Sequence, residues 1–200
     1  MRDYIIMTDS CCDLNQQEVD ELGLTVLPLS FTIDGKTYLN TPDHAEMSPE
    51  EFFAKIAAGE NSTTAAANVG QFDEAMRRAL DAGKDILCIC FSGALSTTYQ
   101  SACIAAEDLK SEYPDAKILV IDSLSASRGQ GMPLYRTAEQ LAEQDQLHQY
   151  EYVIQVDVTA ACQNAFDRMC MRFAEHGVHR KVKDRPDQIC RQHAFQPPLC

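Results

Sequence analysis

Hydroxyl side chains gather in two short segments of the chain, and each segment precedes a predicted helix. Residues 62–64 read Ser-Thr-Thr, and residues 92–98 read Ser-Gly-Ala-Leu-Ser-Thr-Thr after an apolar run. The first turn of a helix has unpaired backbone amides and the positive end of the peptide dipoles, so a hydroxyl-rich helix entrance can bind an acid group without lysine or arginine. Each segment alone is also typical of an ordinary helix cap. Their pairing at one edge of a predicted sheet favours a binding site for a small acidic ligand.

The same region offers little for catalysis. A serine nucleophile needs a base and an orienting group, but His44 is the only histidine in the first 140 residues. Neither Ser92 nor Ser96 lies in a Gly-x-Ser-x-Gly turn. Asp9 and Asp122 follow apolar runs and could hold a magnesium ion for phosphoryl transfer. Because the Gly-x-x-x-x-Gly-Lys phosphate loop is missing and cations are scarce, a role as caps or loop anchors is the favoured interpretation of these aspartates.

Apolar runs alternate with amphipathic, capped segments along the first 142 residues, which predicts an α/β fold. Strands are expected at residues 4–7, 24–33, 36–39, 86–91 and 118–121, the second passing through Pro28. Helices are expected after Asp13, as a cap paired with Gln16, and at residues 49–56, 69–82, 98–113 and 133–142. This order favours a mainly parallel sheet with helices on both faces, with ligands beyond the carboxyl ends of its strands. The polar residues expected along that edge are Asp9, Ser10, Ser92, Ser96, Asp122 and Ser123.

The overall composition excludes several classes of partner. A net charge of -13 over 200 residues argues against nucleic acid or an anionic membrane as the main partner. No charged and apolar leader and no long apolar stretch occurs, which predicts a cytoplasmic protein without an integral membrane segment. The nine cysteines contain no Cys-x-x-Cys and are interpreted as buried apolar residues or free thiols, without a metal site.

Residues 141–200 differ in composition from the rest of the chain. They contain four of the five histidines and four of the nine cysteines, but one of the nine glycines. Their net charge is -1, from 7 basic and 8 acidic residues, against -12 for residues 1–140, from 10 basic and 22 acidic. Only residues 151–158 resemble a strand, so a weakly structured tail is expected. His176, His179 and His193 have no regular spacing and are interpreted as exposed side chains, not metal ligands.

Several short motifs follow one another in the order found in the DegV family. They are Thr8-Asp9-Ser10, Leu27-Pro28-Leu29, Thr63-Thr64 ahead of Val69-Gly70-Gln71-Phe72, Leu95-Ser96-Thr97-Thr98-Tyr99-Gln100-Ser101-Ala102, and Ile121-Asp122-Ser123. Each motif is weak alone, and together they are specific. Over residues 1–142 the chain therefore resembles a bacterial DegV family member, similar to the FakB-like fatty-acid-binding proteins with their EDD fold.

This resemblance implies a function in lipid binding. Such proteins hold the acyl tail of a long-chain fatty acid in an apolar tunnel between two domains, grip the carboxylate with threonine and serine hydroxyls, and present it to a fatty acid kinase. Carried over to this sequence, Thr64 and Ser96 would donate to the carboxylate, with Thr63 and Thr97 beside them. The resemblance implies no catalysis by the chain itself and no cofactor other than the bound fatty acid.

The sequence departs from the family pattern at three places. Residues 64–67 read Thr-Ala-Ala-Ala where Thr-Ser-Gln-Pro is common, and Thr97 stands where a glycine usually follows the serine. Beyond about residue 142 no Gly-Gly-Arg run occurs, so residues 143–200 are interpreted as a divergent, truncated or frameshifted remnant of a second domain. Two alternatives stay open: a magnesium-dependent phosphoryl-transfer enzyme related to dihydroxyacetone kinases, and a truncated product without function.

Overall fold

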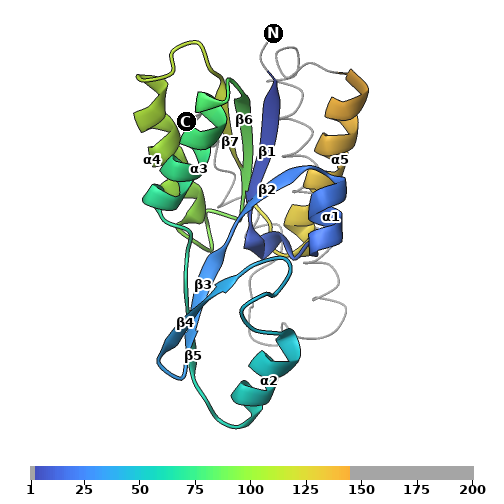
Figure 1. The fold of residues 1–200 in the computed structure, drawn as a ribbon, viewed down its shortest axis with the longest axis vertical. Coiled ribbons are helices and arrows are strands. Elements are labelled where there is room, and N and C mark those ends of the chain that lie inside the picture. The colour runs from blue at the N-terminus through green and yellow to red at the C-terminus, as the bar shows by residue number, and fades with distance from the viewer. Residues whose placement is uncertain (1–2, 145–200) are drawn as a thin grey trace, which may run out of the picture.

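The computed structural model describes residues 3–144, which form two lobes (Figure 1). The larger lobe contains a four-stranded parallel sheet in the order β2-β1-β6-β7. Its strands are β1 (Tyr4–Asp9), β2 (Leu24–Leu27), β6 (Asp85–Cys90) and β7 (Ile118–Asp122). The smaller lobe lies beyond the carboxyl ends of these strands (Figure 1). The predicted α/β fold with a mainly parallel sheet is confirmed.

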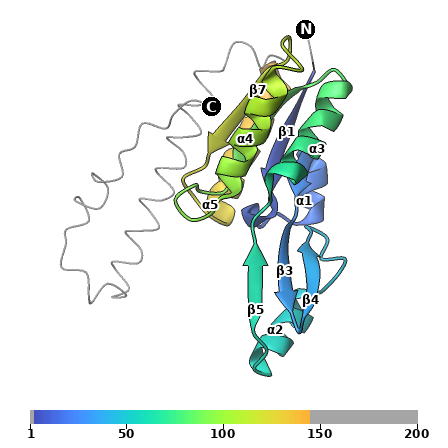
Figure 2. The same ribbon diagram turned by 90° about the vertical axis from the view of Figure 1, so that its left-hand side faces the viewer.

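Helices cover both faces of the parallel sheet. On one face α3 (Val69–Asp81) and α4 (Thr98–Lys110) pack side by side, as Figure 2 shows. On the other face lie α1 (Gln16–Glu21) and α5 (Arg128–Gln144). Each face has its own cluster of buried side chains, so the sheet is the middle layer of three.

Strand β6 shows why an uninterrupted apolar run belongs at the centre of this sheet. All six of its residues are buried. Side chains of a strand alternate between the two faces, and here Cys88 and Cys90 join the core under α3 and α4 while Leu87 and Ile89 join the opposite core. The cysteines within the described residues are all free thiols, in agreement with their interpretation as small apolar side chains.

Asparagine side chains fix the starts of two helices. Asn15 caps α1: its Oδ1 accepts from Glu18 N at 3.0 Å, and the Glu18 carboxylate accepts from Asn15 N at 2.8 Å. The same reciprocal box starts α3 at Asn68. The prediction that Asp13 caps α1 is wrong. Asp13 has a φ of 52° and ends the short 3-10 turn Ser10–Cys12 that follows β1.

The smaller lobe is a three-stranded antiparallel sheet with one helix against it. Its strands are β3 (Leu29–Ile33), β4 (Lys36–Asn40) and β5 (Ser62–Ala65), in the order β4-β3-β5, and its helix is α2 (Pro49–Ala57). Asp34 and Gly35 form the predicted hairpin turn, both with positive φ. Phe31 stacks on Tyr38 at 5.4 Å between ring centroids and meets Phe52 of α2 edge-on at 5.3 Å. This aromatic cluster holds α2 to the sheet.

Two expected elements have different boundaries. Residues 24–33 are not one strand, because Pro28 separates β2 in the parallel sheet from β3 in the antiparallel one. Proline has no amide hydrogen to donate to either ladder. Helix α5 begins at Arg128 and not at Pro133, which lies inside it and leaves the Gly129 carbonyl without its usual helical donor.

The predicted strand at residues 151–158, the predicted tail and its histidines lie outside the described residues. Within the part of the chain that the structure covers, no helix is long and apolar enough to cross a membrane.

Phe72 provides a direct test of this core. It is 0% exposed in the cluster under α3 and α4, so Phe72→Ala should lower the free energy of unfolding by about 3–5 kcal/mol. The control Phe53→Ala removes a ring that is 67% exposed and touches Phe52 edge-on, and should cost only about 0.5–1.5 kcal/mol. Urea unfolding followed by circular dichroism measures both. Equal losses would contradict the described packing.

Candidate functional site

The carboxyl edge of the parallel sheet carries polar residues, as the strand order predicts. Asp9 ends β1, Asp122 ends β7, and Ser92 follows β6. Backbone hydrogen bonds join these connections: Ser92 N donates to the Ser125 carbonyl at 3.1 Å, and Ser123 N donates to the Cys90 carbonyl at 3.0 Å. The loops after β6 and β7 therefore form one connected region.

Asp9 ties three parts of this region together. Its Oδ1 accepts from Cys11 N at 3.0 Å, and its Oδ2 accepts from Phe91 N at 2.7 Å and from Gln130 Nε2 at 3.2 Å. The residue is 0% exposed, and burial raises the pKa of its carboxyl above 3.8 although these donors act in the opposite direction. The carboxylate thus holds the start of the β6–α4 loop to the end of β1.

Asp122 holds the same loop from β7. Both of its carboxylate oxygens lie 3.1 Å from Gly93 N, and Oδ1 also accepts from Leu124 N at 2.8 Å. A Cβ atom at Gly93 would lie 2.9 Å from Asp122 Oδ2 and 3.0 Å from Tyr99 Cδ1, so the close approach requires glycine. Burial raises the pKa of Asp122 and outweighs the two backbone donors. The loop is therefore anchored at Gly93 as well as at Phe91.

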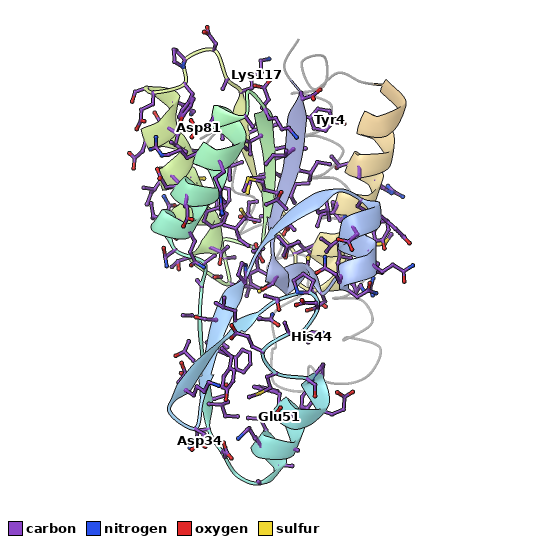
Figure 3. All side chains as sticks on the ribbon, in the orientation of Figure 1. Tyr4, Asp34, His44, Glu51, Asp81 and Lys117 are labelled. Atoms are coloured by element: carbon purple, nitrogen blue, oxygen red, sulfur yellow. The ribbon has the colours of Figure 1, made fainter. Side chains whose placement is uncertain are left out.

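Both aspartates serve as anchors for backbone amides, which is the interpretation that the sequence favours. A magnesium ion needs carboxylate oxygens as ligands, whereas those of Asp9 and Asp122 accept from the chain's own N–H groups. In residues 3–144 no cluster of three or more His, Cys, Asp or Glu side chains could hold a metal. His44 lies in the exposed loop between β4 and α2 (Figure 3).

Ser96 and Thr97 lie at an open helix entrance. Ser96 Oγ lies 2.9 Å from Thr98 Oγ1 and accepts from Thr98 N at 3.3 Å. Thr97, the N-cap residue of α4, makes no side-chain cap hydrogen bond, whereas an asparagine or serine side chain caps α1, α2 and α3. Leu95, next to Ser96, is 69% exposed. The entrance of α4 thus presents hydroxyls at the positive end of a helix dipole.

The structure places Thr63 and Thr64 in strand β5, and not in the loop that the sequence predicts. In the pairing of β5 with β3, Thr64 lies opposite Phe31 and Thr63 opposite Thr32. Both threonines are exposed. Because neighbouring residues of a strand point to opposite faces, the two hydroxyls lie on different sides of the small sheet. Thr64 shares the face of the aromatic cluster.

The two hydroxyl-bearing segments lead into neighbouring helices. Strand β5 runs back toward the large sheet and places Ala65 opposite Ser30, close to Pro28. Helix α3 follows, and Gln71 in its first turn donates to the Pro28 carbonyl at 3.2 Å. Since α3 leads into β6 and α4 follows it, both helices start at the carboxyl edge, where they lie side by side (Figure 2). A joint grip on one carboxylate by both segments stays a prediction.

Comparison with known proteins places this geometry in a family. The sequence model described as "Uncharacterised protein, DegV family" matches residues 4–157. The chain belongs to the DegV family. A DegV domain-containing protein from Clostridium perfringens is 37% identical over 139 residues, which are 70% of this chain and 47% of the relative. One from Lactococcus lactis is 37% identical over 136 residues, 68% of this chain and 47% of the relative. The chain thus spans about half the length of these curated relatives.

Solved structures share the fold. A fatty-acid-binding DegV family protein from Thermus thermophilus superimposes with a TM-score of 0.69 at 31% identity, covering 82% of this chain and 54% of that one. A stearic-acid-binding protein from Eubacterium ventriosum gives a TM-score of 0.67 at 25% identity, covering 76% and 52%. The resemblance to DegV proteins that the motifs indicate is confirmed.

Gln130 at the carboxyl edge is a residue that the sequence patterns did not indicate. Gln130 is 0% exposed and donates to both Thr8 Oγ1, at 3.0 Å, and Asp9 Oδ2. Its flanking residues, Gly129 and Gly131, are the available signal, because a polar residue between two glycines near a helix start indicates a close approach of backbones.

The pKa of Asp122 leads to a test by pH. A folded-state pKa raised above 3.8 means that the folded chain binds this proton more tightly than the unfolded chain, so the stabilisation is complete below 3.8 and is lost as the pH rises through the folded pKa. Asp122→Asn removes this loss and keeps an oxygen for Gly93 and Leu124 N–H. Urea unfolding between about pH 4 and about pH 7 should show the variant gaining stability relative to the wild type as the pH rises. A constant difference would contradict this assignment.

Proposed function

We propose that this chain binds a long-chain fatty acid and presents its carboxylate to a fatty acid kinase, without catalysis of its own. The observation that carries the proposal is the entrance of α4, where the Thr97 side chain makes no cap hydrogen bond and the Ser96 hydroxyl lies beside it. In the proposed site, Thr64 of β5 would supply the second hydroxyl, with Thr63 as its neighbour in the strand. The two solved relatives described as binding fatty acids, at 31% and 25% identity, support the class of ligand.

Several backbone N–H groups of the β6–α4 loop already donate hydrogen bonds within the chain. The side-chain hydroxyls of the loop are therefore the proposed donors to the ligand. Leu95 N and Ser96 N both donate to the Ser92 carbonyl, at 3.0 and 3.1 Å, and Gly93 N donates to Asp122. The Ser96 hydroxyl is half-buried and would donate to one carboxylate oxygen. A hydrogen bond to a charged acceptor is roughly twice as strong as a neutral one, so this grip needs no lysine or arginine.

An apolar side chain stands next to the proposed head-group site. Leu95 is 69% exposed directly before Ser96. In the proposed complex it would contact the first methylene groups of the acyl chain, since the carboxylate lies at the neighbouring residue. Each methylene that such contacts bury contributes about 0.8 kcal/mol.

Binding is tested with Thr64→Val and Ser96→Ala, which remove one hydroxyl each. The wild-type chain should co-purify with a long-chain acyl mass in native mass spectrometry, and each variant should weaken binding of oleate about ten-fold or more, as expected for a lost hydrogen bond to a charged group. The matched control is Ser111→Ala at the other end of α4, whose hydroxyl donates to the Asp108 carbonyl. No acyl mass and no oleate binding would refute the proposal. Magnesium-dependent nucleotide turnover would favour phosphoryl transfer instead.

Presentation to a kinase is a separate test. With a purified fatty acid kinase and ATP, the chain should make acyl phosphate formation depend on its own concentration, and Ser96→Ala should lower the rate at limiting oleate. Ser111→Ala should leave the rate unchanged. A rate independent of the chain would leave lipid binding intact and remove the kinase as partner.

A further inference from the structure

Gln130 reaches the centre of the carboxyl edge, where glycine at position 131 lets α5 approach the 3-10 turn closely. A Cβ atom at Gly131 would lie 3.1 Å from the Cys12 carbonyl oxygen, and one at Gly129 would lie 2.2 Å from Ser125 Oγ. A larger residue at Gly131 would push α5 away from the backbone of the 3-10 turn, and one at Gly129 would displace the Ser125 hydroxyl. The side chain between them is 0% exposed. The sequence Gly-Gln-Gly thus brings one amide group into the polar interior of this edge.

The Gln130 amide joins the ends of two strands. Its Nε2 donates to Thr8 Oγ1 at 3.0 Å and to Asp9 Oδ2 at 3.2 Å. Thr8 Oγ1 in turn donates to the Ile89 carbonyl at 2.8 Å, and Asp9 Oδ2 accepts from Phe91 N at 2.7 Å. One side chain from α5 therefore touches both residues of β1 that hold the end of β6. Phe91 is the first residue of the loop that carries Ser96.

The environment of the amide oxygen of Gln130 indicates that the contacts of its nitrogen are the stabilising ones. Among the described residues, Gln130 Oε1 is buried and has no hydrogen-bond partner. A buried oxygen without a partner is destabilising, and an apolar side chain of similar volume would avoid that cost. The benefit lies with Nε2, which donates to a carboxylate that burial drives toward its neutral form. A neutral Asp9 would turn one oxygen into a donor and a poorer acceptor, so the hydrogen bond from Phe91 or Cys11 would weaken.

We infer that Gln130 is a positioning residue of the head-group site: through Asp9 it fixes Phe91, and with it the loop that carries Ser96. It acts through these residues and not by contact with the fatty acid. The inference deepens the proposed function and rests on Ser96 as a ligand of the carboxylate.

The other titratable groups that face Asp9 are thiols that stay neutral. They are Cys11 and Cys12 of the 3-10 turn and Cys90 of β6. Burial raises the pKa of Cys11 to about 12 and that of Cys12 to about 11, and a hydrogen bond with its strand neighbour raises that of Cys90. Helix α5 contributes the uncharged Gln130. Asp122, whose pKa burial also raises, accepts from Gly93 N in the same loop. A titration observed at the Phe91 amide below about pH 7 is therefore assigned to Asp9 only where the Gln130 side-chain amide, which also donates to Asp9, shows the same midpoint.

The test is an NMR pH titration of the full chain carrying Gln130→Met, which keeps the side-chain length and removes both polar atoms. The midpoint observed at the Phe91 amide nitrogen should move to higher pH, because Asp9 loses a donor that stabilises its ionised form. The amides of Gly93 and Ser96 should exchange with solvent about ten-fold faster, because their loop is held less firmly. The control Gln100→Met, on the exposed side of α4, should change neither quantity.

Oleate binding separates this inference from the proposed function. If both hold, Gln130→Met weakens oleate binding about ten-fold together with the Phe91 shift. If the wild type binds no oleate but Gln130→Met moves the midpoint and the exchange rates, the positioning role stands and the carrier function fails. A folded Gln130→Met chain with the wild-type midpoint and wild-type exchange overturns the inference, whether or not oleate binds.

The wild-type chain provides a second measurement in case Gln130→Met does not fold. The side-chain Nε2 protons of Gln130 should shift with the same pH midpoint as the Phe91 amide, because both donate to Asp9 Oδ2. Two different midpoints would overturn the inference.

Discussion

The carboxyl edge of this protein depends on one buried carboxylate. Asp9 is 0% exposed, and its burial is offset only by hydrogen bonds from three separate segments: the 3-10 turn, the start of the β6–α4 loop, and α5. Each donor alone leaves the charge poorly compensated, so the three segments must be in place together. This makes the edge a cooperative unit in which the hydroxyl-bearing loop takes its position from residues more than a hundred positions apart in the sequence.

The charge of the chain determines how an acid could be selected. A net charge of -13 repels an anionic ligand at long range. At short range, the hydroxyls and the helix dipole of the proposed head-group site would attract its carboxylate. Such donors recognise a carboxylate but contribute little to the approach of the ligand. Most of the free energy of binding must then come from the apolar part of the acid. A lipid satisfies this condition, and a short-chain acid does not.

Much of the fold can be predicted from local patterns. The apolar run of β6, the glycines that end helices and the Asn68 box each act through neighbours in the sequence, and each element is found where it is expected. The predictions that were wrong concern residues whose structure depends on contacts with residues far away in the sequence. Thr64 lies in a strand because it pairs with Phe31, a partner that no local pattern reveals. Gln130 lies before the helix that the sequence predicts from Pro133, and its role depends on the packing of α5 against the 3-10 turn. The real cap of α1, Asn15, competes with an equally plausible aspartate.

Pro28 separates the two sheets at a single residue. The run from Leu24 to Ile33 serves the parallel sheet before this residue and the antiparallel sheet after it, and the proline nitrogen donates to neither ladder. The registers of the two sheets are therefore set independently. Inserting or deleting a residue at the Asp34–Gly35 turn would shift β3 against β4 and leave the pairing of β1 with β2 untouched. The small lobe can thus change its length and surface in evolution while the carboxyl edge that positions the β6–α4 loop is preserved.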